Sequence, residues 1–189
     1  MENMLKMRWS LSIILVALFL MLLVPTSVAA QEVPQLPALY WGTVRIISPT
    51  GQFNIPPGTT ITVQVDGVER GSIRVNEPGK YGGPSGLDAK LTLQGDILQG
   101  SSVEFYIGGV KADQTTYFRN DQPQQINLTV HIVLGDANLD GNVNAVDITK
   151  VERIIAQLDA IRLCADANVD GDVNAIDITK VERIIAGLD

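Results

Sequence analysis

The sequence predicts an all-β sandwich followed by a small all-α domain made of two loop–helix repeats. Residues 38–134 are rich in Thr, Val and Ile, with Gly or Pro at intervals of about 8–12 residues, which is typical of short strands. From residue 135 to residue 189 the pattern changes to two near-identical segments, in which an acidic loop precedes an amphipathic stretch. These two observations define the fold class and the boundary between the domains.

The first thirty residues predict a signal peptide. Lys6 and Arg8 precede an apolar stretch, 11–24, and small residues at Val28 and Ala30 offer a cleavage point. An uncleaved membrane anchor is the alternative, because the uncharged residues 9–31 reach the roughly 20 residues that span a bilayer. Cleavage is favoured because Pro25 interrupts the apolar stretch and small residues follow it. Both alternatives predict an extracellular protein, secreted or at the cell surface, and membrane attachment only without cleavage.

A short linker with two prolines, 31–37, precedes the predicted sandwich. In the segment TITVQV, Ile61, Val63 and Val65 share one face of a strand while polar residues share the other. We expect a small antiparallel sandwich, similar in architecture to immunoglobulin-like or transthyretin-like modules. The predicted strands cover residues 39–48, 59–67, 71–77, 89–95, 101–109, 115–120 and 125–133.

Composition excludes several classes of function. The net charge of -7 argues against a nucleic-acid partner, because phosphate binding needs clustered Lys and Arg. A single cysteine and a single histidine exclude an internal disulfide and a zinc site of the Cys/His kind. We interpret Cys164 as a small apolar core residue rather than a reactive thiol. His131 lies in an apolar strand with no nucleophile nearby in the sequence.

The two repeats, 136–159 and 166–189, are identical at 20 of 24 aligned positions. Each loop has oxygen-bearing side chains at positions 1, 3, 5, 9 and 12, with glycine at position 6. Calcium takes six to eight oxygen ligands, and position 7 of such a loop supplies a backbone carbonyl. The predicted calcium ligands are Asp136, Asn138, Asp140, Asn142 (backbone), Asn144 and Asp147, then Asp166, Asn168, Asp170, Asp172 (backbone), Asn174 and Asp177.

The details of each loop fit a cation. Gly141 and Gly171 permit the sharp turn that wraps a chain around an ion. Asp147 and Asp177 stand where a helix begins, although glutamate is the usual last ligand of such a loop. The segment 136–189 carries eleven acidic and five basic residues, so two calcium ions would change its net charge from -6 to -2. We therefore predict two calcium ions and a domain that needs them to fold.

These loops resemble those of type I dockerin domains, which have two loop–helix repeats, no helix before either loop and Asp closing each loop. The resemblance covers residues 136–189, and it implies calcium-dependent binding to a cohesin domain on a scaffold protein, as in cellulosomes. It further implies partner contacts at loop positions 10 and 11 and at positions 17, 18 and 22. These residues are Ala145, Val146, Glu152, Arg153 and Gln157, then Ala175, Ile176, Glu182, Arg183 and Gly187.

Many type I dockerins have Ser-Thr at positions 10 and 11, where this chain has Ala145-Val146 and Ala175-Ile176. Exposed apolar pairs would be partner anchors, whereas pairs tucked beneath the domain would be structural. Because the repeats are nearly identical, a pseudo-twofold axis would present almost the same surface after half a turn. Either helix would then be able to make the main contacts with the same partner.

The helices are expected to run over residues 147–159 and over the matching stretch of the second repeat. Each has five apolar residues at helical spacing, and we expect these two stripes to pack against each other. The stripes are Ile148, Val151, Ile154, Ile155 and Leu158, then Ile178, Val181, Ile184, Ile185 and Leu188.

The sandwich carries no catalytic constellation that spacing identifies. Five of its carboxylates, Asp66, Asp88, Asp96, Glu104 and Asp113, are interpreted as solvated turn residues rather than a glycosidase pair. Its aromatic residues are expected to fill core and edges rather than form a sugar platform. The leading hypothesis is a secreted, non-catalytic adaptor. The alternatives are a polysaccharide-binding component and a glycoside hydrolase or a subunit associated with one.

Overall fold

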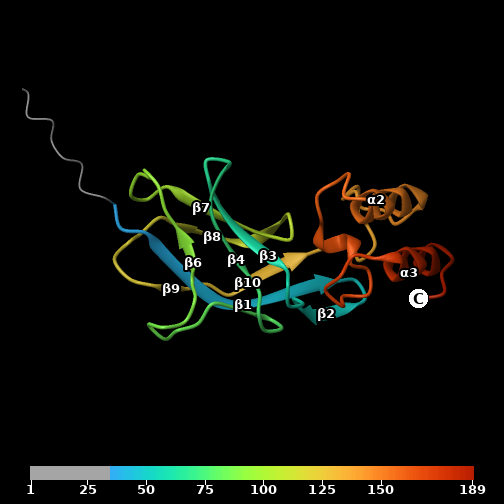
Figure 1. Cartoon of the computed structure of the whole chain (residues 1–189), viewed down its shortest axis with the longest axis horizontal. Coiled ribbons are helices and arrows are strands. Elements are labelled where there is room, and N and C mark those ends of the chain that lie inside the picture. Colours follow the sequence, from blue (N-terminus) through green and yellow to red (C-terminus); the bar gives the residue numbers. More distant parts are fainter. Residues whose placement is uncertain (1–34) are drawn as a thin grey trace, which may run out of the picture. The chain divides into compact units, whose positions relative to one another are not determined.

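The computed structural model describes residues 35–189, in which two β-sheets pack face to face and are followed by a helical segment (Figure 1). The predicted signal peptide lies outside the described residues, as does most of the predicted linker. The all-β sandwich and the small helical segment that the sequence predicts are both confirmed.

One sheet has four strands in the order β4-β3-β7-β8, and all of its pairings are antiparallel. Its strands are β3 (Thr60–Val65), β4 (Val68–Arg74), β7 (Ser102–Ile107) and β8 (Val110–Tyr117). Along β3 the buried side chains are Ile61, Val63 and Val65, so the alternation seen in the sequence is confirmed.

The second sheet is built around the long strand β1 (Ala38–Ser48). Antiparallel to it run β2 (Gly51–Asn54), β5 (Lys80–Tyr81) and β6 (Leu91–Leu93), whereas β9 (Gln124–Gln125) and β10 (Leu128–His131) run parallel. The prediction of a purely antiparallel sandwich is therefore wrong for this sheet. Between β1 and β10 the chain forms β2, β5 and β6 beside β1 as well as all four strands of the opposite sheet. This long connection includes the crossover that a parallel pair of strands needs.

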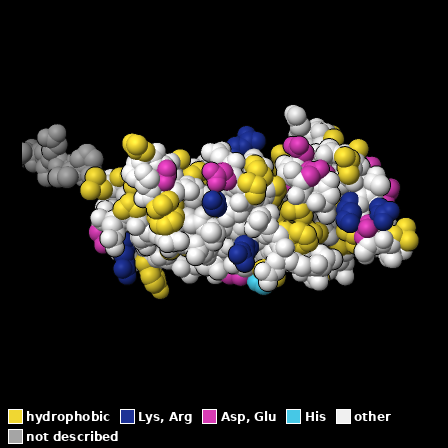
Figure 2. Space-filling view, turned by 90° about the horizontal axis from the view of Figure 1, so that it is seen from below, with side chains coloured by type: hydrophobic (Ala, Val, Ile, Leu, Met, Phe, Trp, Pro, Cys, Tyr) yellow, Lys and Arg dark blue, Asp and Glu magenta, His cyan; other side chains and the backbone are white. Residues whose placement is uncertain are grey.

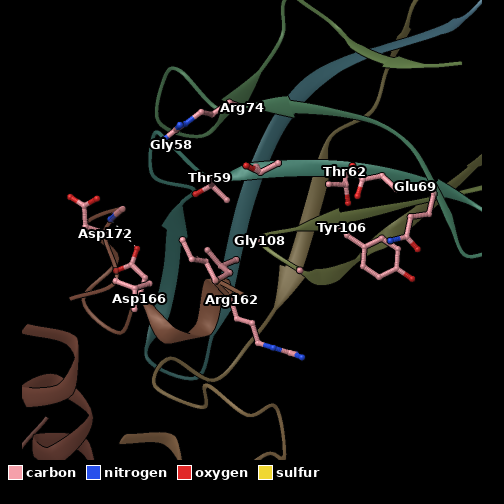
Figure 3. Close-up of a pocket in the computed structure, with 17 residues that line it drawn as sticks. Gly58, Thr59, Thr62, Glu69, Arg74, Tyr106, Gly108, Arg162, Asp166 and Asp172 are labelled. Atoms are coloured by element: carbon pink, nitrogen blue, oxygen red, sulfur yellow. Dashed lines mark hydrogen bonds between the residues drawn. The ribbon is translucent and has the colours of Figure 1, made fainter. Parts of the chain in front are cut away.

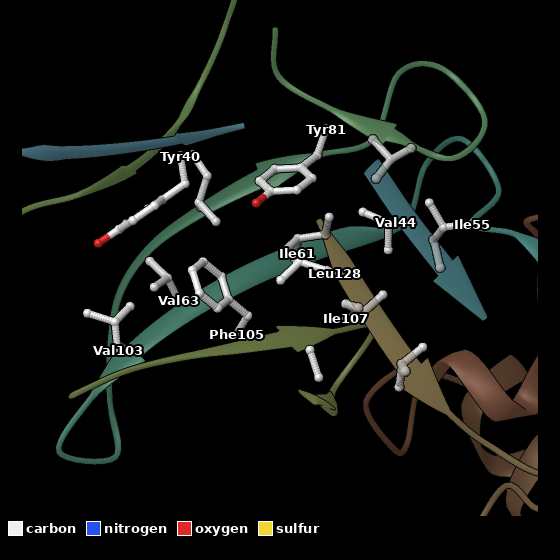
Figure 4. Close-up of a cluster of buried hydrophobic side chains, with 14 of the residues drawn as sticks. Tyr40, Val44, Ile55, Ile61, Val63, Tyr81, Val103, Phe105, Ile107 and Leu128 are labelled. Carbon is white, nitrogen blue, oxygen red and sulfur yellow. The ribbon is translucent and has the colours of Figure 1, made fainter. Parts of the chain in front are cut away.

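The core lies between the two sheets and is fully buried (Figure 4). The rings of Tyr40 and Phe105 meet edge to face, with centroids 5.3 Å apart and planes at 89°. The Tyr81 hydroxyl donates a hydrogen bond of 2.7 Å to the backbone oxygen of Ile126, which satisfies a polar atom inside this core. Four of the eight aromatic residues in 38–134 are buried, in agreement with the expected core role: Tyr40, Tyr81, Phe105 and Phe118.

The helical segment contains α2 (Ala145–Ile155), the short 3-10 helix η1 (Leu163–Ala165) and α3 (Ala175–Ile185). Each α-helix starts two residues earlier than predicted and ends earlier too. Asn144 caps α2, and beyond it Gln157 adopts a left-handed conformation (φ 58°). The Leu158 amide then bonds to the Arg153 carbonyl and the Gln157 amide to that of Ile154, which is the Schellman pattern that stops a helix. None of the helices in residues 35–189 is long and apolar enough to cross a membrane.

The two apolar stripes pack only in part. Val151, Ile154 and Val181 are buried in a small core that also holds Ala137, Ala165 and Ala167. The prediction is wrong for Ile155, Leu158, Ile185 and Leu188, which are 41–66% exposed. These four residues lie at or beyond the helix ends, where the chain turns away from the neighbouring helix.

The helical segment is also built into the sandwich. Leu163 and Cys164 of η1 are buried in the sandwich core, so Cys164 is the apolar core residue that the sequence predicts. The Leu163 amide donates to the carbonyl of Gly108 in the β7–β8 turn, at 2.9 Å. Residues 35–189 accordingly form one compact unit. A boundary between residues 134 and 135 stays a prediction.

Candidate metal centre

The first residue of each loop anchors the turn that follows it. The Asp136 carboxylate accepts hydrogen bonds from the amides of Asp140 (3.1 Å) and Gly141 (2.8 Å). In the second loop, Asp166 accepts from Asp170 (3.0 Å) and Gly171 (2.9 Å). Each aspartate therefore folds the middle of its own loop back over its carboxylate.

The last residue of each loop ties the loop to its helix. The Asp147 carboxylate accepts from the amides of Asn138 (3.1 Å) and Asn144 (2.9 Å), and Asp177 accepts from Asn168 (3.3 Å) and Asn174 (2.8 Å). The carboxylates at positions 1 and 12 thus hold both halves of a loop together.

Positions 3 and 5 contact each other directly. The Asn138 side chain donates to Asp140 at 2.8 Å, and Asn168 donates to Asp170 at 2.7 Å. The Asn138 hydrogen bond is the main reason why the pKa of Asp140 is lowered. The carboxylates of one loop do not converge, and no group of three or more His, Cys, Asp or Glu side chains does so anywhere in residues 35–189. The fit to a cation therefore depends on the oxygen-only donor set and on burial.

Burial of the carboxylates is the main electrostatic feature of this segment. Asp136, Asp147, Asp166 and Asp177 are at most 5% exposed, and they are the only charged residues buried within residues 35–189. None of the ion pairs in the same part of the chain involves them. Burial raises the pKa of Asp166 to about 6 and also raises that of Asp177. Buried carboxylates are costly unless a positive charge lies nearby, so this donor set suits a hard cation.

The remaining predicted ligands lie in the same loops. Asn142 and Asp172, at position 7, have exposed side chains, which is compatible with the predicted backbone role. Asn144 and Asn174 have a second role that the sequence analysis missed, because their side chains cap the helices by accepting from Val146 and Ile176. The Asn-x-x-Asp pattern at each helix start was the available signal.

The predicted partner residues are all exposed. Val146 and Ile176 are 59% and 60% exposed, so the apolar pairs at positions 10 and 11 are not tucked beneath the domain. Ala145, Glu152, Arg153 and Gln157 are exposed as well, together with Ala175, Glu182, Arg183 and Gly187. Figure 2 shows hydrophobic and charged side chains interspersed at the surface around the helices.

A salt-bridge cluster after each helix was not anticipated from the sequence. Asp159 pairs with Lys150 (2.8 Å) and Arg153 (2.8 Å), and Asp189 pairs with Lys180 (3.2 Å) and Arg183 (2.7 Å). We call each set a clasp: Asp159 with Lys150 and Arg153, and Asp189 with Lys180 and Arg183. Each clasp fixes one of the arginines that the resemblance assigns to partner binding.

Three of the five sandwich carboxylates have local partners. Asp88 accepts from the Ser85 amide within the glycine-rich loop, and Glu104 pairs with Lys111. Asp113 pairs with His131 at 3.1 Å, which places the single histidine at the surface. These contacts explain where the three carboxylates lie, and the explanation needs no catalytic role.

Residues 134–186 match the family model described as the dockerin type I domain. No curated protein and no solved structure matches the chain. The C-terminal part of the chain is thus a type I dockerin domain, as its resemblance predicts. Dockerin domains bind calcium and dock onto cohesin domains.

Proposed function

We propose that the chain is a secreted docking protein whose dockerin domain binds two calcium ions and attaches the sandwich to a cohesin-bearing scaffold. The sandwich then acts as the carried module, and no catalytic role is assigned to it. One ion is held by Asp136, Asn138, Asp140, Asn144 and Asp147 with backbone oxygen at Asn142, and the matching residues of the second loop hold the other. A bound ion supplies the positive charge that the buried carboxylates lack.

The observation that carries this proposal is the set of four buried aspartates that form no ion pair within residues 35–189. In this part of the chain each of them accepts hydrogen bonds from backbone amides, which orient a carboxylate but do not remove its charge. Two such sites in a segment with few large core residues make folding dependent on the cation.

The exposed face supports docking by apolar contact. Val146 and Ile176 occupy equivalent places at the starts of α2 and α3, and each has a fixed arginine on the same helix. Anchor residues and arginines are both common near the centre of an interface. We therefore expect a cohesin whose docking surface is apolar opposite these positions.

A calcium titration of the full chain tests the cation part of the proposal. Calorimetry with calcium chloride should give two ions per chain, and chelation should reduce helicity in circular dichroism. The matched variants Asp136→Asn and Asp166→Asn should each remove one ion. A stoichiometry of zero with unchanged helicity would contradict the proposal.

Binding to purified cohesin domains tests the docking part. A panel of type I cohesins should include one that binds the calcium-loaded chain and releases it on chelation. The double variant Val146→Asp with Ile176→Asp should abolish that binding while two calcium ions still bind. Arg45→Glu, an exposed change on the sandwich, is the control that should leave binding unchanged.

A further inference from the structure

The two calcium loops have nearly the same sequence but different surroundings. A Cβ atom added to Gly171 in the second loop would lie 3.1 Å from the carbonyl oxygen of Pro57 and 3.3 Å from the Pro56 side chain. A Cβ atom added to Gly141 in the first loop would meet no atom within 4 Å. The second loop therefore touches the turn before β3, and the first loop has no equivalent neighbour at this position.

The residues at position 4 of the two loops also differ in how closely they pack on the sandwich. Val169 packs against the sandwich core, whereas its counterpart Leu139 is 40% exposed. Both have positive φ, 59° for Val169 and 65° for Leu139, so both are held in an uncommon conformation. In the second loop the residue in that conformation packs against the sandwich core, whereas in the first loop it lines a surface cavity with Ile47 and Pro49.

The chain just before the second loop is fixed to the sandwich by η1. The Leu163 amide donates a hydrogen bond to the Gly108 carbonyl, and a Cβ atom added to Gly108 would lie only 2.9 Å from the Leu163 Cβ. Asp166, the first residue of the loop, follows three residues later. The first loop is instead continuous with β10, so it is joined to the sandwich through the chain.

A cavity of about 620 Å³ lies where these elements meet (Figure 3). Thr60, Thr62 and Tyr106 line it from the four-stranded sheet, and Asp166 and Asp172 line it from the second loop. The second loop is thus closely packed where it meets Pro56 and Pro57, and it is open to solvent where it lines the cavity.

We infer that the turn at Pro56–Pro57 and the turn at Gly108–Gly109 form an interaction surface for one segment of the same chain. The first turn contacts the second calcium loop, and the second turn contacts η1, which leads into that loop. Occupancy of that loop by calcium stabilises the adjoining end of the sandwich, and the first loop does not stabilise that end. This inference rests on the proposed calcium function. Binding to one state stabilises it by mass action, and the coupling is reciprocal, so the sandwich also raises the calcium affinity of the second loop.

Hydrogen exchange of the full chain, followed by mass spectrometry with and without calcium chloride, tests this coupling. The Gly108 amide donates a hydrogen bond to the Thr60 carbonyl, and the Gly58 amide donates to the Val75 carbonyl. Exchange in peptides 54–62 and 105–110 therefore reports when this end of the sandwich opens. At 100 times the Kd, calcium should slow their exchange by up to roughly 100-fold. Asp136→Asn should keep this protection and Asp166→Asn should lose it. Equal protection in both variants would overturn the inference.

The glycines of the β7–β8 turn provide a second test that leaves the calcium ligands intact. Gly108 and Gly109 both have positive φ, 51° and 78°, so alanine costs backbone energy at either position. A Cβ atom at Gly109 meets only the Ile161 oxygen, at 3.9 Å. Gly108→Ala should therefore weaken the calcium-dependent protection and the affinity of one calcium site, and Gly109→Ala should preserve both.

The two proposals fail in different ways. If calorimetry shows no calcium bound to the wild-type chain, the proposed function itself fails. If two ions bind but peptides 54–62 and 105–110 exchange at the same rate with and without calcium, only the coupling fails.

Discussion

The carboxylate of Asp159 accepts two hydrogen bonds from one side of the Arg153 guanidinium, from Nε at 2.8 Å and from Nη2 at 3.1 Å. Lys150 adds a third contact at 2.8 Å. Asp189 and Arg183 repeat the paired geometry, at 2.7 and 3.1 Å. A residue outside each helix thus orients an exposed arginine on it, and the geometry is the same in both repeats.

The first prediction concerns the pH dependence of this clasp. Hydrogen bonds from Arg153 first, and from Lys150 second, lower the pKa of Asp159. A carboxylate with a lowered folded-state pKa stabilises the fold above its unfolded pKa of about 3.9 and loses that effect as the pH falls through the folded value. A carbon-detected NMR titration should therefore give Asp159 a midpoint below pH 3.9. Arg153→Gln should raise the midpoint, and an unchanged value would contradict the clasp.

The second prediction concerns the two arginines as partner contacts. Arg153 and Arg183 occupy equivalent positions on helices with nearly identical exposed residues. If either helix can lead in docking, Arg153→Glu alone should barely weaken cohesin binding, because the other helix takes over. Changing Arg153 and Arg183 together should abolish it. A surface plasmon resonance series would measure both, and a large loss from the single change would refute this dual mode.

The third prediction concerns Cys164. Burial, and to a lesser extent the negative charge of Asp136, raise its pKa to about 12. Its thiol should therefore not react with a disulfide reagent at pH 8 while the chain is folded, and it should react rapidly in denaturant. Because the unfolded thiol ionises near pH 8.5, stability should fall as the pH rises above that value. Stoichiometric labelling of the folded chain would contradict the burial.

The sequence predicts the architecture well because its strongest signals are local. Alternation in β3 and the duplicated loops depend on neighbouring residues, and both are found where they are expected. The parallel pairing of β1 with β10 depends on residues more than eighty positions apart, such as Val44 and Leu128, and no local pattern encodes it. The short strands β2, β5 and β9 were missed for the same reason, since two to four residues give too little periodicity.

The two acidic loops could be predicted from the sequence, but their surroundings could not. Side-chain type and spacing identify Asp136, Asp147 and their repeats as a set. No local pattern shows that a Cβ atom at Gly171 would meet Pro57 while one at Gly141 would meet no atom within 4 Å, because that difference arises from how the chain folds onto the sandwich. The exposure of Leu158 also escaped prediction, because helical spacing does not reveal where a helix stops.

The fourth prediction concerns the helix ends, where the repeats differ by one informative substitution. Gln157 and Gly187 occupy the same position of the same Schellman pattern, with φ of 58° and 68°. Glycine adopts this conformation without steric cost, whereas glutamine does not. Gln157→Gly should therefore raise the free energy of unfolding by about 0.5–1 kcal/mol, and Gly187→Gln should lower it by a similar amount.

Urea unfolding in saturating calcium chloride would measure both variants. The two changes act at exposed positions far from the metal ligands in the sequence, so calcium stoichiometry should stay at its wild-type value and serves as the control. The opposite signs make the test strict, because a general effect of substitution would move both variants the same way. If Gln157→Gly is destabilised as well as Gly187→Gln, the Gln157 side chain makes a contact that stabilises the fold by more than its positive φ costs.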